Sequence, residues 1–350
     1  MNKELKIFAV VAAFTLALYY GVEPYAHSQM HHHVEGNALK YDGTADVEEV
    51  VTAIEEIKKT AEEEGKTPDQ AKLDALAKKQ EAKKAFWADV TKIADKYKGD
   101  ATAGKATFDM ACTGCHMDGA VNMGGVTPPS LDHAGSLYDR NYLIALIKDP
   151  AMASNIDHKY PNGTMSHPMG SISTMVSAPQ DIANVVAYLK EKKVGHLEPR
   201  EAFTEACGRC HANRYGKLTQ LGDYPKTKSN IATGKDIDRM KYDQKVAEEQ
   251  AAVAKYMGKL PPDLSIMIRA RSEHFMHTFI ENPQSQLKGT AMPRVGLSHE
   301  GMDKVMEYLE ETGDPSAPAR AMAGPWVLGF FVIFTILAYL WKQSQWRDLH

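Results

Sequence analysis

Two short segments carry the residues best suited to chemistry in this chain of 350 residues. Both have the pattern C-x-x-C-H, at residues 112–116 and 207–211, and together they use all four cysteines. The pattern is typical of c-type haem attachment, in which two thiols bond to one porphyrin and the next imidazole lies under the iron. The sequence therefore predicts two covalently attached haem c groups. The attaching residues would be Cys112, Cys115 and His116 in one site and Cys207, Cys210 and His211 in the other.

Other uses of a C-x-x-C pair explain these segments less well. A zinc site would combine the two pairs, and a redox dithiol needs only the cysteines. Neither role requires a histidine directly after each second cysteine. A net charge of -4 gives no reason to expect a nucleic-acid partner, and no phosphate-binding glycine loop, nucleophile elbow or carboxylate metal motif is present. These features favour an electron carrier with no catalytic residues of its own.

The two motifs belong to an internal repeat. Around each motif recur a phenylalanine, a two-proline loop, a helical segment ending in proline and an amphipathic segment with a tyrosine. They are Phe108, 128–131, 142–150 and Tyr188 in the first copy, and Phe203, 261–264, 275–283 and Tyr308 in the second. The second copy also has an insertion after its haem motif. This order resembles the class I cytochrome c fold.

The expected fold is therefore mainly α, with two tandem class I cytochrome c domains at residues 100–195 and 196–315. In each domain the aromatic pair, Phe108 with Tyr188 or Phe203 with Tyr308, should meet where the first and last helices cross.

Rapid electron transfer also needs a second axial ligand on each iron, and a soft methionine sulfur favours the ferrous state. The chain has 17 methionines, most of which must be packing residues. Met292, followed by Pro293, lies in the loop before the last helix of the second domain, where a class I cytochrome c has its methionine. We predict Met292 as the second ligand there.

The first domain offers several candidates for this ligand. Met169, which follows a proline, is favoured over Met165. Met175 stands close to the start of the last helix, and His158 and His167 lie nearby, so these three remain further alternatives.

Both ends of the chain carry apolar segments. Residues 320–345 contain an almost wholly apolar core at 326–341, and about 20 helical residues at 1.5 Å each span a ~30 Å hydrocarbon layer. We predict a C-terminal transmembrane helix there. Residues 1–23 are interpreted as a second anchor, with a cleaved signal peptide as the alternative. The basic ends then lie on the cytoplasmic side of a bacterial inner membrane, and the haem domains lie in the periplasm.

Residues 24–99 separate the first anchor from the haem domains. Apolar positions recur at helical spacing on both sides of a break at residues 65–68, which predicts a charged helical hairpin in the periplasm. A solvated spacer is favoured over a docking arm for a partner subunit. A histidine cluster at residues 27–33 is interpreted as a solvated segment beside the membrane, with a metal site as the alternative.

From Cys207 onward the chain resembles cytochrome c1, the haem subunit of the cytochrome bc1 (quinol:cytochrome c oxidoreductase) complex. The resemblance rests on the haem motif with Tyr215 and Leu221 after it, and on the string G-K-L-P-P-D-L-S at residues 258–265. It also rests on Ala270-Arg271, and on Asp314-Pro315, Arg320 and Gly324 ahead of the C-terminal anchor.

The resemblance implies that Arg271 pairs with a haem propionate; a surface position on its helix is the alternative. With two haem motifs, the chain resembles the dihaem cytochrome c1-type subunits of some bacterial bc complexes. This implies cytochrome b and the Rieske iron–sulfur protein as partners, and a periplasmic cytochrome c or a terminal oxidase as acceptor. The alternatives are a dihaem electron-donor subunit of a haem–copper oxidase and, as an enzyme, a dihaem peroxidase.

Overall fold

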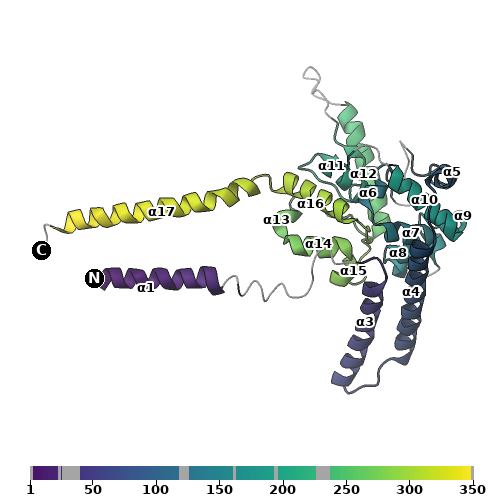
Figure 1. The fold of residues 1–350 in the computed structure, drawn as a ribbon, viewed down its shortest axis with the longest axis horizontal. Coiled ribbons are helices and arrows are strands. Elements are labelled where there is room, and N and C mark those ends of the chain that lie inside the picture. Colours follow the sequence, from purple (N-terminus) through teal and green to yellow (C-terminus); the bar gives the residue numbers. More distant parts are fainter. Residues whose placement is uncertain are drawn as a thin grey trace. The chain divides into compact units, whose positions relative to one another are not determined.

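The computed structural model describes residues 3–22, 25, 40–117, 126–160, 163–192, 196–225 and 237–347. In these ranges the chain is mainly helical (Figure 1). Its contacts divide it into two compact units. The first unit is Met1–Ala111, Tyr138–Tyr188 and Glu273–His299, and the second is Cys112–Leu137, Leu189–Ser272 and Glu300–His350. Each unit therefore contains segments from both of the expected cytochrome domains.

The first unit contains the N-terminal helix, a long helical hairpin and short helices from both repeats. Its elements are α1 (Lys3–Ala17), η1 (Leu18–Val22), α3 (Thr44–Glu63), α4 (Gln70–Lys96), α5 (Ala101–Ala111), α7 (Arg140–Lys148), α8 (Pro150–Ala153), η2 (Asp157–Lys159), η3 (Thr164–Ser166), α9 (Ile172–Met175), most of α10 (Pro179–Glu191), α14 (Glu273–Glu281) and α15 (Pro283–Gln286).

The second unit contains both cysteine motifs. Its elements are α6 (Ala134–Leu137), α11 (Pro199–Ala206), β1 (Leu218–Thr219), β2 (Gly222–Asp223), α12 (Ile237–Met257), α13 (Met267–Ala270), nearly all of α16 (His299–Gly313) and α17 (Ala317–Trp346). β1 and β2 form an antiparallel pair, and with α12 they occupy the insertion of the second repeat.

The helices α3 and α4 form the predicted hairpin and lie side by side (Figure 1). Gly65 ends α3 with a positive φ of 63°, and the Asp69 carboxylate caps α4 by accepting a hydrogen bond from the Lys72 N–H. Near its C-terminal end α4 packs against α7, and the side chains of Trp87, Val90 and Ile93 are at most 2 % exposed. The hairpin is therefore not a solvated spacer along its whole length.

Both aromatic pairs expected at the helix crossings are in contact. The ring centroids of Phe108 and Tyr188 lie 5.1 Å apart in the first unit, and those of Phe203 and Tyr308 lie 4.7 Å apart in the second. Gly104 allows α5 to approach α10 closely, because a Cβ at this position would lie only 1.9 Å from the Asn184 carbonyl oxygen.

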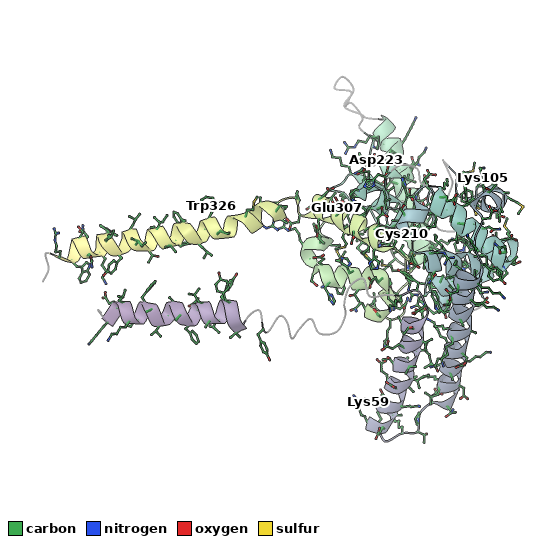
Figure 2. The ribbon with its side chains drawn as sticks, in the orientation of Figure 1. Lys59, Lys105, Cys210, Asp223, Glu307 and Trp326 are labelled. Atoms are coloured by element: carbon green, nitrogen blue, oxygen red, sulfur yellow. The ribbon has the colours of Figure 1, made fainter. Side chains whose placement is uncertain are left out.

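Two helices near the ends of the chain have the length and apolar composition of a membrane span. One comprises α1 and η1, Lys3–Val22, and the other is α17, which contains the segment predicted at residues 320–345. The side chains of both helices are largely exposed, Trp326 among them at 81 %, as the sticks along α17 illustrate (Figure 2).

Candidate haem-attachment sites

The first cysteine motif begins where α5 ends. The chain turns tightly after Cys112, since the amides of Cys115 and His116 both donate to the Cys112 carbonyl oxygen, at 3.2 and 2.9 Å. The Cys112 side chain is buried, Cys115 is exposed, and neither forms a disulfide. The His116 Nδ1 lies 2.8 Å from the Pro129 carbonyl oxygen, which belongs to the first two-proline loop.

The second motif repeats this geometry at the end of α11. The amides of Cys210 and His211 donate to the Cys207 carbonyl oxygen, at 3.1 and 2.9 Å. The His211 Nδ1 lies 2.8 Å from the Pro262 carbonyl oxygen, in the corresponding two-proline loop. In each motif, the histidine is therefore oriented by the carbonyl oxygen of the second proline in its own two-proline loop.

This geometry settles which imidazole nitrogen carries the proton. A carbonyl oxygen only accepts, so each Nδ1 must donate, and a neutral imidazole then keeps its lone pair on Nε2. Burial lowers the pKa of both His116 and His211, which favours the neutral form. A metal-bound histidine normally donates its other ring N–H in this way. The histidines therefore fit a haem iron at Nε2.

Burial keeps one cysteine thiol of each motif protonated. Burial raises the pKa of the Cys112 thiol to about 11 and that of the Cys207 thiol to about 12, so both thiols are neutral near pH 7. Among the residues that the structure describes, no group of three or more His, Cys, Asp and Glu side chains could hold a metal ion.

The second two-proline loop is fastened directly to the residues that follow His211. The Asp263 carboxylate accepts hydrogen bonds from the amides of Arg214, at 3.1 Å, and Ser265, at 3.0 Å. The Leu264 N–H donates to the Ala212 carbonyl oxygen at 2.9 Å. These bonds hold the Pro262 carbonyl in place, which gives the P-P-D-L string a physical role.

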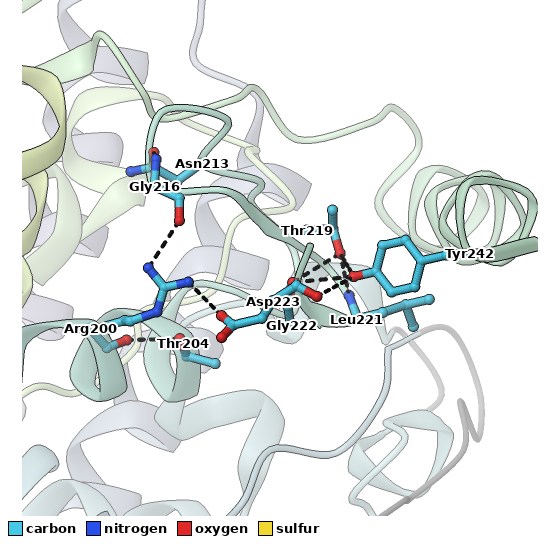
Figure 3. Close-up of polar contacts among 9 residues, drawn as sticks. All are labelled: Arg200, Thr204, Asn213, Gly216, Thr219, Leu221, Gly222, Asp223 and Tyr242. Carbon is cyan, nitrogen blue, oxygen red and sulfur yellow. Dashed lines mark hydrogen bonds and ion pairs between the residues drawn. The ribbon is translucent and has the colours of Figure 1, made fainter. Parts of the chain in front are cut away.

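The inserted β1–β2 pair is held between α11 and α12 (Figure 3). Arg200 of α11 donates to the Gly216 carbonyl oxygen, at 2.9 Å, and pairs with the Asp223 carboxylate. Tyr242 of α12 donates to the Asp223 carbonyl oxygen, at 3.0 Å, and its hydroxyl lies 2.7 Å from that of Thr219. The insertion is thus built against the helix that leads into the second motif.

Within the second unit, the segment after the first motif packs against that same helix. The His133 Nδ1 lies 2.8 Å from the carboxylate of Glu205, which stands two residues before Cys207. Burial raises the pKa of Glu205. Arg209, inside the second motif, is close enough to contribute to the lowered pKa of His116. The two motifs are therefore neighbours.

The methionines predicted as second axial ligands lie in the first unit. Met169 and Met292 are half-buried, whereas Met165 is 59 % and Met175 is 50 % exposed. Because the cysteine motifs lie in the other unit, ligation by these methionines stays a prediction.

Two further predicted sites are Arg271 and the histidine cluster at residues 27–33. Arg271 is exposed and follows the C-terminal end of α13, so its pairing with a propionate also stays a prediction. The histidine cluster at residues 27–33 lies outside the described residues. The Met169 N–H donates to His167 Nδ1, at 3.0 Å, and burial lowers the pKa of His167 to about 4.

Two features of the structure were not predicted from the sequence. One is the pair of carbonyl partners, Pro129 and Pro262, which the recurrence of the two-proline loops could have indicated. The other is Arg294, two residues after Met292, whose guanidinium is buried against Asp46. Nothing in the spacing of these two residues could have paired them.

The fold and the site define a cytochrome c-type electron-transfer protein. Residues 101–193 match the cytochrome c family, and a domain of this family binds haem c covalently. The chain is similar to the ammonia monooxygenase gamma subunit of Nitrosomonas europaea, with 25% identity over 194 residues, covering 43% of this chain and 81% of the relative.

The chain is also related to cytochrome c1. It is 22% identical over 202 residues to cytochrome c1 of Allochromatium vinosum, covering 42% of this chain and 82% of the relative. Among solved structures, a chain of a hyperthermophilic respiratory Complex III has 26% identity and a TM-score of 0.34, over 43% of this chain and 75% of that chain.

Proposed function

We propose that this chain is a dihaem cytochrome c1-type subunit of a bacterial quinol:cytochrome c oxidoreductase. Its second half would accept electrons from the Rieske iron–sulfur protein, and its first half would pass them to a periplasmic cytochrome c or a terminal oxidase. The observation that carries the proposal is the repeated site geometry. Each C-x-x-C-H motif presents an imidazole whose Nδ1 lies 2.8 Å from the carbonyl oxygen of a two-proline loop.

In this function the residues of the chain hold and orient rather than react. Two cysteines in each motif fix one porphyrin, and the Pro129 and Pro262 carbonyls keep Nε2 of His116 and His211 available to iron. Bound haem supplies reversible one-electron chemistry. Met169 and Met292 would complete the two iron sites, and Arg271 would pair with a propionate of the second haem.

The proposed location follows from the apolar helices at the two ends. With α1 and α17 in a bacterial inner membrane, the cysteine motifs would lie in the periplasm, where the acceptors are found. The relation to cytochrome c1 supports cytochrome b and the Rieske protein as partners. Within the membrane, α17 would supply most of the surface open to cytochrome b.

The alternative is a dihaem electron-donor subunit of a haem–copper oxidase. That function accounts for an N-terminal anchor and tandem haem domains, but not for the P-P-D-L-S string at residues 261–265 or for α17. A dihaem peroxidase would need one iron with an open sixth position, which disagrees with the prediction of methionine ligands at both.

The proposal is tested by purifying the chain from mild detergent. We expect a Rieske subunit and a multi-span cytochrome b to accompany it, and quinol to reduce all of its haem. An inhibitor of the quinol-oxidation site should block that reduction. A chain truncated after Ala319 should keep its haem but no longer assemble with cytochrome b. Recovery with oxidase subunits instead, or reduction by quinol without cytochrome b, would favour the alternative.

A further inference from the structure

The loop that carries Met292 has no helix or strand of its own between α15 and α16. Its conformation is held by local bonds, such as the one that the Met292 N–H donates to Thr290 Oγ1 at 3.2 Å, and by bonds to other segments of the first unit. The Arg294 N–H donates to the Ser154 carbonyl oxygen at 2.9 Å, and the Arg294 carbonyl oxygen accepts from the Tyr142 hydroxyl at 2.8 Å. These bonds hold the backbone two residues after Met292.

The Arg294 side chain reaches the N-terminal hairpin. Its two terminal nitrogens both donate to the carboxylate of Asp46 in the first turn of α3, with Nη1 at 3.3 Å from Oδ2. The two side chains are only 1 % and 2 % exposed. A guanidinium and a carboxylate paired through two parallel bonds fix both distance and orientation. A buried ion pair therefore joins the hairpin to this loop.

Asp46 is itself held in place by α4. The Trp87 indole N–H donates to its carboxylate at 2.8 Å, and Trp87 is 2 % exposed. Gly43, just before α3, makes room for that ring, since a Cβ at Gly43 would lie 2.4 Å from it. The carboxylate is thus placed by both helices of the hairpin before it meets Arg294.

We infer that Asp46 is a positioning residue for Met292, so that the N-terminal hairpin acts as a clamp on the loop that supplies the iron's second ligand. This inference rests on the proposed ligation of the second haem by Met292. Residues 40–97 contain no cysteine and no haem motif. Their part is to keep the sulfur in place while the iron changes its oxidation state.

The test uses the purified full-length holoprotein in detergent and two readouts of the methionine–iron bond. One is the weak far-red charge-transfer band of ferric haem with a sulfur ligand, and the other is the affinity for added imidazole. The share of the band that Met292→Ala removes belongs to the second haem. Asp46→Asn should remove most of that share. It should also raise the imidazole affinity about tenfold, because the Met292 sulfur on a loosened loop no longer competes with imidazole for the iron.

The chain offers a matched control. Glu56 of α3 and Lys288 of the same loop segment also form an ion pair, at 2.6 Å, but both are more than half exposed. Glu56→Gln should leave the band and the imidazole affinity unchanged, because exposed pairs contribute little. Asp46→Glu, which keeps the carboxylate, should retain much of the band. If Asp46→Asn yields no holoprotein, Trp87→Phe removes the indole donor and should weaken the same signals.

A double-mutant cycle separates positioning from general destabilisation. In a Met292→Ala background, Asp46→Asn should cause no further change in the band or in imidazole affinity. A wild-type band and affinity in both Asp46→Asn and Trp87→Phe would overturn the inference while leaving ligation by Met292 intact. A band unchanged by Met292→Ala would instead overturn the ligation itself, and with it the role of Asp46.

Discussion

A single backbone oxygen orients each predicted proximal histidine. The Pro129 and Pro262 carbonyls fix the proton on Nδ1, and the tight turns after Cys112 and Cys207 bring the imidazoles to that point. The histidines could be predicted from the sequence because the cysteines stand at fixed spacing beside them. Their carbonyl partners could not, because every residue has a carbonyl and only the fold selects one.

The prediction for the second iron concerns the chemistry of its sixth ligand. Met292→His should keep haem attached but lower the potential of that centre by on the order of 0.1 V, because imidazole replaces a soft thioether within the ~0.8 V range that axial ligands command. Redox titration of the purified protein measures the shift. Met240→His, an exposed position on α12, is the control. An unchanged potential in Met292→His would show that another residue binds this iron.

For the first iron, the two candidate methionines differ in exposure. Met169 is half-buried, whereas Met165 is 59 % exposed, and a ligand must approach the haem out of water. We expect Met169→His to lower the potential of the first centre and Met165→His to leave it unchanged. The same redox titration decides between them, and the reverse pattern would assign the ligand to Met165.

At the scale of the elements, close helix contacts depend on small residues as well as on aromatic pairs. Gly104 lets α5 lie against α10, and Phe108 meets Tyr188 one turn further along α5. The aromatic pairs could be predicted because the repeat places both at matching positions. The need for glycine could not, because a close approach has no periodic signal in the sequence.

This contact gives a stability prediction. Gly104→Ala would place a methyl group against the Asn184 carbonyl, and such overpacking costs about 1–3 kcal/mol of unfolding free energy. Denaturant unfolding of the holoprotein measures the loss. Lys105→Ala in the same helix removes only an exposed ion pair with Asp109 and should cost less than about 1 kcal/mol. Equal losses in both variants would mean that α5 and α10 do not approach this closely.

The packing contacts of the hairpin could not be predicted from the sequence. Helical spacing predicted α3 and α4, but a solvated spacer was favoured over a docking arm for this charged segment. Two of those charges, Asp46 and Lys83, are each 1 % exposed. In the sequence, Lys83 lies at helical spacing with Phe86 and Val90, and this place on the apolar face of the helix indicated its burial. The partner Arg294 lies too far along the chain for any local pattern to pair it with Asp46.

That buried pair also sets the ionisation of Asp46. Burial opposes the charged carboxylate, but Arg294, Lys83 and the Trp87 N–H outweigh it, so the pKa of Asp46 lies below its ordinary value. A lowered pKa in the folded state means that the carboxylate stabilises the fold above its unfolded pKa, and that this contribution is lost as pH falls through the folded value. The clamp is therefore intact at neutral pH.

For the whole molecule, the two haem motifs lie in one compact unit and the candidate sulfur ligands in the other. The sequence predicted two successive domains, because a repeat in sequence suggests a repeat in space. Each compact unit contains segments of both repeats, and the two successive domains stay a prediction. The packing partners of long connections such as the hairpin and the β1–β2–α12 insertion cannot be predicted from spacing alone.

Both cysteine motifs are expected to hold haem covalently, so the number of haems per chain should be two. After extraction with acidic acetone, a pyridine haemochrome assay and the mass of the intact chain should both give two haems per polypeptide. A variant with Cys207→Ala and Cys210→Ala should keep one, and so should a variant with Cys112→Ala and Cys115→Ala. A single haem on the unmodified chain, or no loss in either variant, would show that the two motifs do not each hold a haem.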